Sequence, residues 1–176
     1  MEPLNSLTDM KRNFKRCIIM VGTPGTGKST FAAKLLADFD KTNPNSPCMI
    51  VSADDYFIER TGKYNFRPER LGRAHEYCFD LFKQAIFYGN ELIVVDNTNS
   101  KWADYSKYVK AALLSGYSVE LMQPDTPWKN DAAECHKRCV HGVPLETIER
   151  TLKNIQTERE NALNSGISDK TVSVCA

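Results

Sequence analysis

The chain has 176 residues, of which 41% are hydrophobic and 26% are charged. This length and composition are typical of one globular domain with a single core, and they exclude an intrinsically disordered chain. The 23 basic and 22 acidic residues leave a net charge of +1. Such a balance argues against a protein that coats long stretches of nucleic acid, but it leaves contact with a strand end open.

Targeting and metal signals are weak. No apolar run reaches the length of a membrane span, and the first ten residues lack the basic start and apolar stretch of a secretory signal. We therefore expect an intracellular protein, cytoplasmic or nuclear, without a membrane partner. Cys135 and Cys139 lie near His136 and His141, but no second pair of spaced ligands accompanies them, so we expect no structural metal there.

Four short apolar runs are the candidate strands: Cys17–Val21, Cys48–Val51, Leu92–Val95 and Val119–Met122. The first three are apolar at every position, which is typical of parallel strands covered on both faces. Apolar residues at helical spacing lie between and after these runs, in the sets Phe31, Leu35, Phe39; Leu71, Ala74, Cys78, Leu81, Ala85; and Tyr105, Val109, Ala112, Leu113.

Strands that alternate with helices predict an α/β fold with a largely parallel sheet. We expect one domain over residues 15–161, with polar tails at 1–14 and 162–176. A further helix is expected to begin at Pro127, because proline suits the first helical position and Thr126 before it is a capping residue.

The strongest motif begins directly after the first apolar run and reads GTPGTGKST. It satisfies the phosphate-loop pattern G-x-x-x-x-G-K-[ST] between a strand and a helix. Glycines let the backbone curl until its N–H groups point at phosphate oxygens, and the helix N-terminus adds partial positive charge. The expected ATP-binding residues are Gly22, Thr23, Pro24, Gly25, Thr26, Gly27, Lys28, Ser29 and Thr30. Lys28 is expected to reach the β- and γ-phosphates and Ser29 to ligate Mg²⁺.

Carboxylates follow two of the other strands. Asp96 ends the run Leu92–Val95, where it is expected to hold Mg²⁺ with Ser29, although it would also suit a simple helix cap. Asp54 and Asp55 follow the second strand on the same edge of the sheet. Asp54 is the candidate base that takes a proton from an acceptor hydroxyl, and Asp55 the more structural residue; the alternative is that both cap a helix.

Two further segments carry cations. The stretch 58–70 interleaves aromatic residues with Arg60, Lys63, Arg67 and Arg70, which would suit a nucleic-acid end as well as ordinary loop packing. Arg138 lies between two expected helices, where a cationic lid could offset charge on transferring phosphate. Its alternative is a solvated helix face.

Taken in order, the phosphate loop, SADDYF, VVDNTN, PDTPW and KRCVHGVP resemble the P-loop polynucleotide 5′-hydroxyl kinase family over about residues 16–158. The likeness is strongest to the kinase domain of the Nedd-four-binding-protein-two-like group. It implies an adenylate-kinase-like sheet of four or five parallel strands with the phosphate-loop strand in the middle. It also implies that Asp54 is the general base and that Arg138 belongs to a helical lid.

Two positions depart from this family. Phe57 and His141 stand where the phage-type enzymes carry arginines. The departure leaves open that other residues hold the acceptor, or that the chain binds nucleotide without phosphorylating a polynucleotide. Our hypothesis is an ATP- and Mg²⁺-dependent kinase that acts on a 5′-hydroxyl of DNA or RNA. The alternatives are a small-molecule kinase on the same fold and a non-catalytic ATP-binding interaction module.

Overall fold

The computed structural model describes residues 15–164 and 172–175, and its strands form one parallel sheet. The sheet order is β2-β3-β1-β4-β5, and every neighbouring pair is parallel. The strands are β1 (Arg16–Met20), β2 (Cys48–Val51), β3 (Leu92–Val95), β4 (Ser118–Met122) and β5 (Val172–Cys175). The strand that leads into the phosphate loop therefore lies in the middle. The predicted P-loop α/β fold is confirmed.

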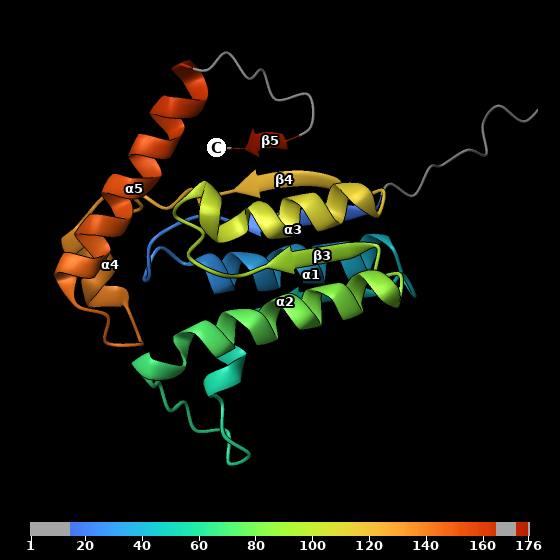
Figure 1. Ribbon diagram of the computed structural model, residues 1–176, viewed down its shortest axis with the longest axis horizontal. Coiled ribbons are helices and arrows are strands. Elements are labelled where there is room, and N and C mark those ends of the chain that lie inside the picture. Colours follow the sequence, from blue (N-terminus) through green and yellow to red (C-terminus); the bar gives the residue numbers. More distant parts are fainter. Residues whose placement is uncertain (1–14, 165–171, 176) are drawn as a thin grey trace, which may run out of the picture.

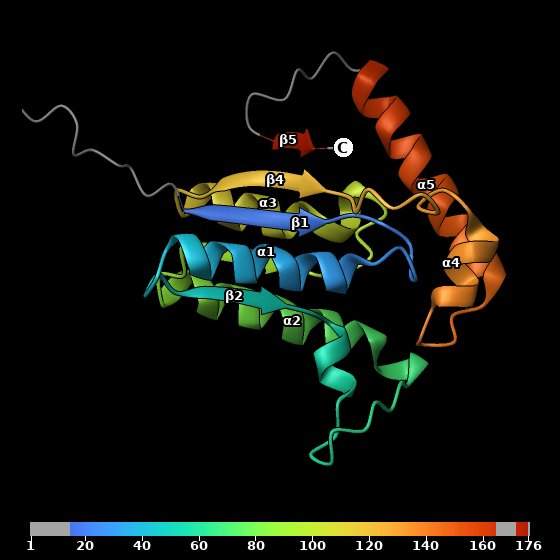
Figure 2. The same cartoon turned by 180° about the vertical axis from the view of Figure 1, so that it is seen from behind.

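Helices cover both faces of this sheet. The α-helices are α1 (Lys28–Thr42), α2 (Leu71–Phe87), α3 (Trp102–Leu114), α4 (Ala132–Arg138) and α5 (Leu145–Asn164), with 3-10 turns η1 (Asp54–Phe57) and η2 (Pro68–Arg70). Helix α1 packs on one face and α2 and α3 on the other (Figures 1 and 2). Helices α4 and α5 lie beyond the carboxyl ends of the strands (Figure 1). None of the described helices is long and apolar enough to cross a membrane.

The central strand shows why apolar runs mark this sheet. Alternate side chains of a strand point to opposite faces. Ile18 and Met20 pack with the residues of α1, whereas Cys17 and Ile19 pack with those of α2 and α3. All four side chains are fully buried. Because both faces are covered, neither set of positions needs a polar residue, which explains the unbroken apolar pattern.

The C-terminal boundary differs from the prediction. Residues 162–176 were expected to be a polar tail, but α5 continues to Asn164, and β5 pairs with β4 and becomes the edge strand of the sheet, with Val172 opposite Val119. The physical reason is that the backbone of an edge strand offers unpaired N–H and C=O groups to any segment that reaches it. A short run such as β5 can pair there without a strong apolar pattern of its own.

The helix expected at Pro127 is also absent from the structure. Pro127 lies in a turn, and α4 begins at Ala132 instead. The cap is Asp131, whose side chain accepts a hydrogen bond from the N–H of Glu134 at 3.0 Å. Thr126 does not cap a helix, because its hydroxyl is directed to the phosphate loop, as described below.

Candidate active site

The phosphate loop joins β1 to α1 and takes a conformation that depends on glycine. Gly25 and Gly27 have φ angles of 85° and 90°, in the left-handed region that L-residues with a side chain rarely adopt. At Gly25 a second constraint applies, because a Cβ atom there would overlap the carbonyl oxygen of Cys135. Helix α4 thus packs directly against the loop, and position 25 has no room for a side chain.

Two side chains fold back onto the loop from inside. The Thr26 hydroxyl donates to the carbonyl of Thr23 at 2.8 Å, and the ammonium of Lys28 donates to the same carbonyl at 3.0 Å. Burial lowers the pKa of Lys28, and the nearby charges of Asp96 and Asp54 oppose this shift. Lys28 is therefore a partly desolvated cation that shares one electrostatic environment with both carboxylates.

Two residues of the segment after β4 hold the loop from outside. The indole N–H of Trp128 donates to the carbonyl of Gly25 at 3.2 Å, and the Thr126 hydroxyl donates to the carbonyl of Thr26 at 3.3 Å. Carbonyls that are bonded outward leave the N–H groups of the loop free to point inward. Sequence reasoning missed this function of the PDTPW segment, for which only the family resemblance gave a signal.

Arg138 contacts Trp128, which in turn contacts the phosphate loop. Its guanidinium stacks on the ring of Trp128 at 4.0 Å from the centroid and pairs with the carboxylate of Glu134 at 3.1 Å. The thiol of the buried Cys135 donates to the carbonyl of Trp128 at 3.3 Å, which fixes α4 against the same segment. The structure thus places Arg138 against Trp128, which holds the phosphate loop from outside, and not in direct contact with Lys28.

Asp96 and Ser29 meet at the end of β3. Asp96 is only 8% exposed, and burial raises its pKa, while the nearby Ser29 side chain and the charge of Lys28 oppose the shift. Among the described residues no cluster of three or more His, Cys, Asp or Glu side chains is placed to hold a metal. Two hard oxygen ligands fit Mg²⁺, which keeps waters and takes phosphate oxygens.

The two neighbouring carboxylates after β2 have different surroundings. The Tyr64 hydroxyl donates to Asp54 Oδ1 at 3.0 Å, and His141 Nε2 lies 3.8 Å from Asp54 Oδ2. Burial raises the pKa of Asp55, and the charge of Asp54 adds to the shift. The Asp54 side chain is 53% exposed and faces the segment that follows α4.

The asparagines after Asp96 connect the strand ends that carry these groups. Asn97 Oδ1 accepts from the N–H of Ala53 at 2.9 Å, just before Asp54. Asn99 Nδ2 donates to the carbonyl of Met20 at 2.8 Å, just before the phosphate loop. Both asparagines are buried. The segment therefore holds the ends of β1, β2 and β3 in one register.

These relationships define a P-loop nucleotide-binding protein, because the loop, its lysine and the buried strand-end carboxylate converge at one edge of a parallel sheet. A family model described as an AAA domain matches residues 17–161. The chain belongs to this AAA domain family.

Individual proteins are similar over much of the chain. Human NEDD4-binding protein 2 is 34% identical over 156 residues, which are 88% of this chain and 8% of that protein. A chain of the Pnkp1/Rnl/Hen1 RNA repair complex has a TM-score of 0.61 at 21% identity, covering 89% of this chain and 49% of that one. Kti12 of Chaetomium thermophilum, solved with ADP-AlF3, has a TM-score of 0.54 at 14% identity, covering 91% and 88%. The two solved structures show a shared fold alone, and this chain spans about half or less of the first two proteins.

Proposed function

We propose that the chain is an ATP- and Mg²⁺-dependent kinase that transfers the γ-phosphate of ATP to a 5′-hydroxyl of DNA or RNA. The observation that carries this proposal is the shared environment of Lys28 and Asp54. Lys28 begins α1 after β1 and Asp54 begins η1 after β2, so both lie at the carboxyl edge of one parallel sheet, and the charge of Asp54 acts to raise the pKa of Lys28. A kinase needs this pair, one group for the donor and one for the acceptor.

The donor would be held by the phosphate loop. Its inward N–H groups and the N-terminus of α1 would bind the phosphate oxygens, and Lys28 would exchange the Thr23 carbonyl for a β- or γ-phosphate oxygen. Kti12, which shares the fold, was solved with the nucleotide analogue ADP-AlF3. Ser29 and Asp96 would hold Mg²⁺, which neutralises phosphate charge when it is bound.

The acceptor step would use Asp54. Its carboxylate would accept the proton of the 5′-hydroxyl while that oxygen forms a bond to the γ-phosphorus. The bond between the γ-phosphorus and the β–γ bridging oxygen breaks, and ADP leaves with the electron pair of that bond. The Tyr64 hydroxyl donates to Asp54 and would keep the carboxylate oriented during the transfer.

Arg138 would act only after a movement. Its guanidinium is engaged by Trp128 and Glu134, so contact with the transferring group requires that it leave at least one of them. A change of the Arg138 side-chain rotamer, with α4 kept in its place on the phosphate loop, would bring this about and would place positive charge beside the developing negative charge. The role of Arg138 is thus proposed for that second conformation of its side chain.

The test is transfer of labelled γ-phosphate from ATP to short 5′-hydroxyl DNA and RNA oligonucleotides, with Lys28→Ala as the control variant. Transfer that disappears in Lys28→Ala would support the proposal and identify the preferred strand. Intact ATP binding with no transfer to either strand would refute it and would favour a nucleotide-binding module.

A further inference from the structure

The residue directly after β2 is bonded to both of the backbones that carry the candidate carboxylates. The Ser52 hydroxyl donates to the backbone carbonyl of Asp96 at 3.0 Å, and its oxygen accepts a hydrogen bond from the backbone N–H of Asp54 at 3.2 Å. Ser52 is buried. A hydroxyl has one proton to donate and two lone pairs to accept with, so this single group links the backbone of the candidate base to that of the candidate metal ligand.

This link continues the pairing of β2 with β3 beyond the strands themselves. The N–H of Asp96 donates to the carbonyl of Val51 at 2.9 Å, which is the last backbone bond between the two strand ends. Where β2 turns into η1, side chains take over: Ser52 bonds to Asp96, and Asn97 Oδ1 accepts the N–H of Ala53. Buried backbone groups that leave a sheet need such partners.

The carboxylates that this link holds repel one another. The charge of Asp54 acts to raise the pKa of Asp96, and the charges of both act to raise the pKa of Asp55. Repulsion between like charges favours a larger separation of the groups that carry them. Lys28 opposes this repulsion, because both Asp54 and Asp96 act to raise its pKa. The bonds of Ser52 are a second constraint, since they fix the two backbones without adding a charge.

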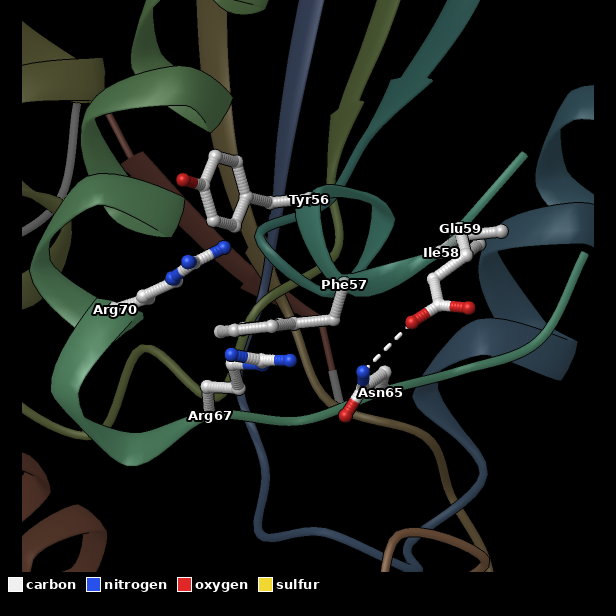
Figure 3. Close-up of a pocket in the computed structure, with 7 residues that line it drawn as sticks. All are labelled: Tyr56, Phe57, Ile58, Glu59, Asn65, Arg67 and Arg70. Atoms are coloured by element: carbon white, nitrogen blue, oxygen red, sulfur yellow. Dashed lines mark hydrogen bonds between the residues drawn. The ribbon is translucent and has the colours of Figure 1, made fainter. Parts of the chain in front are cut away.

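The other end of η1 is held by apolar packing. The rings of Tyr56 and Phe57 both point from the turn toward α2 (Figure 3), where Tyr56 lies against Tyr77 with centroids 5.7 Å apart. Phe57 is buried in the core cluster to which α2 contributes. Because this packing does not involve Ser52, loss of the Ser52 hydroxyl should leave the end of η1 on α2 and release its start, where Asp54 lies.

We propose that Ser52 is a positioning residue that fixes the Asp54 carboxylate relative to Asp96 by joining their backbones. The proposal rests on the proposed function, because it takes Asp54 as the base for the acceptor hydroxyl and Asp96 as a ligand of the Mg²⁺ that accompanies the donor. Transfer requires the attacking oxygen within about 3–3.5 Å of the γ-phosphorus, and a misplacement of about 1 Å costs about 10²-fold in rate. Ser52 therefore acts through Asp54 and does not itself contact the substrate.

The first experiment measures transfer of γ-phosphate to a 5′-hydroxyl oligonucleotide by Ser52→Ala. We expect kcat to fall about tenfold to hundredfold while the Kd for ATP changes by less than about twofold, because the phosphate loop keeps its own contacts. Tyr117→Phe is the matched control, since it removes another buried hydroxyl, which donates to the carbonyl of Asn90 at the opposite edge of the sheet. It should keep kcat. An equal fall of kcat in both variants would overturn the proposal.

A pair of variants with equal shape tests whether the hydroxyl itself is responsible. Ser52→Thr keeps the hydroxyl, whereas Ser52→Val has nearly the same volume and lacks it. Ser52→Thr should therefore be at least about fivefold faster in kcat than Ser52→Val, which should be as slow as Ser52→Ala. Equal rates in the threonine and valine variants would contradict a function of the hydroxyl.

A double variant tests whether the effect passes through the base. In an Asp54→Asn background no base is left to position, so the further change Ser52→Ala should lower the residual kcat by less than about twofold. A general loss of stability would instead lower activity by the same factor in both backgrounds. The full loss in the Asp54→Asn background would rule out a role of Ser52 that acts through Asp54.

The second experiment does not depend on turnover. The N–H of Asp54 should exchange with solvent deuterium about tenfold faster in Ser52→Ala, measured by mass spectrometry in a peptide that spans η1. The amides of β3 should keep their wild-type exchange, and Tyr117→Phe should leave the η1 peptide unchanged. Unchanged exchange of this peptide in Ser52→Ala would mean that the hydroxyl does not hold the start of η1, and the assignment would fail.

The two readouts separate the two proposals. If the wild-type protein transfers no phosphate but Ser52→Ala speeds exchange at the start of η1, the kinase function fails and Ser52 stands as the residue that holds Asp54. If transfer occurs and Ser52→Ala alters neither kcat nor exchange, the kinase function stands and the assignment of Ser52 fails.

Discussion

His141 Nε2 lies 3.8 Å from Asp54 Oδ2, which joins the segment after α4 to the end of β2. The imidazole also packs on the ring of Tyr64, with centroids 4.4 Å apart, and Tyr64 is itself bonded to Asp54. A residue of the segment after α4 and a residue of the segment after β2 therefore share one carboxylate. Movement of the connection between α4 and α5 has to break this contact.

Loss of the imidazole should loosen that connection. In His141→Ala, tryptic cleavage after Lys137 and Arg138 is expected to be about fivefold faster, as if about 1 kcal/mol of local stability were removed. The control is Val140→Ala, because Val140 is 88% exposed and its truncation removes little contact. Equal cleavage rates in the two variants would show that His141 does not fasten the connection.

Replacement of the candidate base should separate chemistry from donor binding. Asp54→Asn keeps the shape and an acceptor for the Tyr64 hydroxyl but removes the proton acceptor, so kcat should fall by about 10²–10⁴ while ATP affinity stays nearly unchanged. Asp80→Asn is the charge-matched control, since Asp80 is exposed on α2 and pairs with Lys83 of the same helix. Full activity in Asp54→Asn would refute the assignment.

The thiol of Cys48 is partly exposed, but it should react slowly with alkylating reagents. Burial and the hydrogen bond to Asp40 raise its pKa to about 11, so the neutral thiol dominates at ordinary pH. At pH 8 only about one molecule in a thousand carries the thiolate, and alkylation should accelerate about tenfold per pH unit until the pKa is reached. Asp40→Asn should increase the rate at pH 8. Peptide-resolved mass spectrometry measures this, and wild-type alkylation at the rate of free cysteine would contradict it.

Much of the fold was accessible from the sequence for a simple reason. Strands that are buried on both faces appear as continuous apolar runs, and those predicted at 48–51 and 92–95 coincide with β2 and β3. The phosphate loop was equally visible, since its chemistry requires fixed residues at fixed spacing. Local patterns of this kind depend on neighbours in the chain, which a single sequence contains.

The remaining features depend on residues that are distant in the chain. The bond from Trp128 to Gly25 joins positions 103 residues apart, and no local pattern indicates which carbonyl an indole will reach. The same holds for β5, whose pairing depends on the open edge of β4.

Close packing of α4 on the phosphate loop can be tested at Gly25. Gly25→Ala combines a disfavoured φ of 85° with overlap of the Cys135 carbonyl, whereas Gly116→Ala has a similar φ of 80° and open space around the new atom. Both should lower the free energy of unfolding in urea by about 1 kcal/mol or more from backbone strain. Gly25→Ala should lose about 2 kcal/mol beyond that and should bind ATP at least about tenfold more weakly. Equal losses in both variants would mean that α4 moves away at little cost.

The hydrogen bond from the indole N–H of Trp128 to the Gly25 carbonyl can be tested for its effect on ATP binding. Trp128→Phe keeps an aromatic ring for Arg138 but removes the donor to the Gly25 carbonyl, which frees the loop to turn that carbonyl inward toward the phosphates. A single hydrogen bond of this kind contributes about 1 kcal/mol, so ATP affinity should fall about fivefold by calorimetry. The chain has one other tryptophan, Trp102, which is half exposed at the start of α3 and packs on Tyr105. Trp102→Phe should leave ATP affinity unchanged, and if it weakens ATP binding as much as Trp128→Phe does, the indole of Trp128 does not support the nucleotide site.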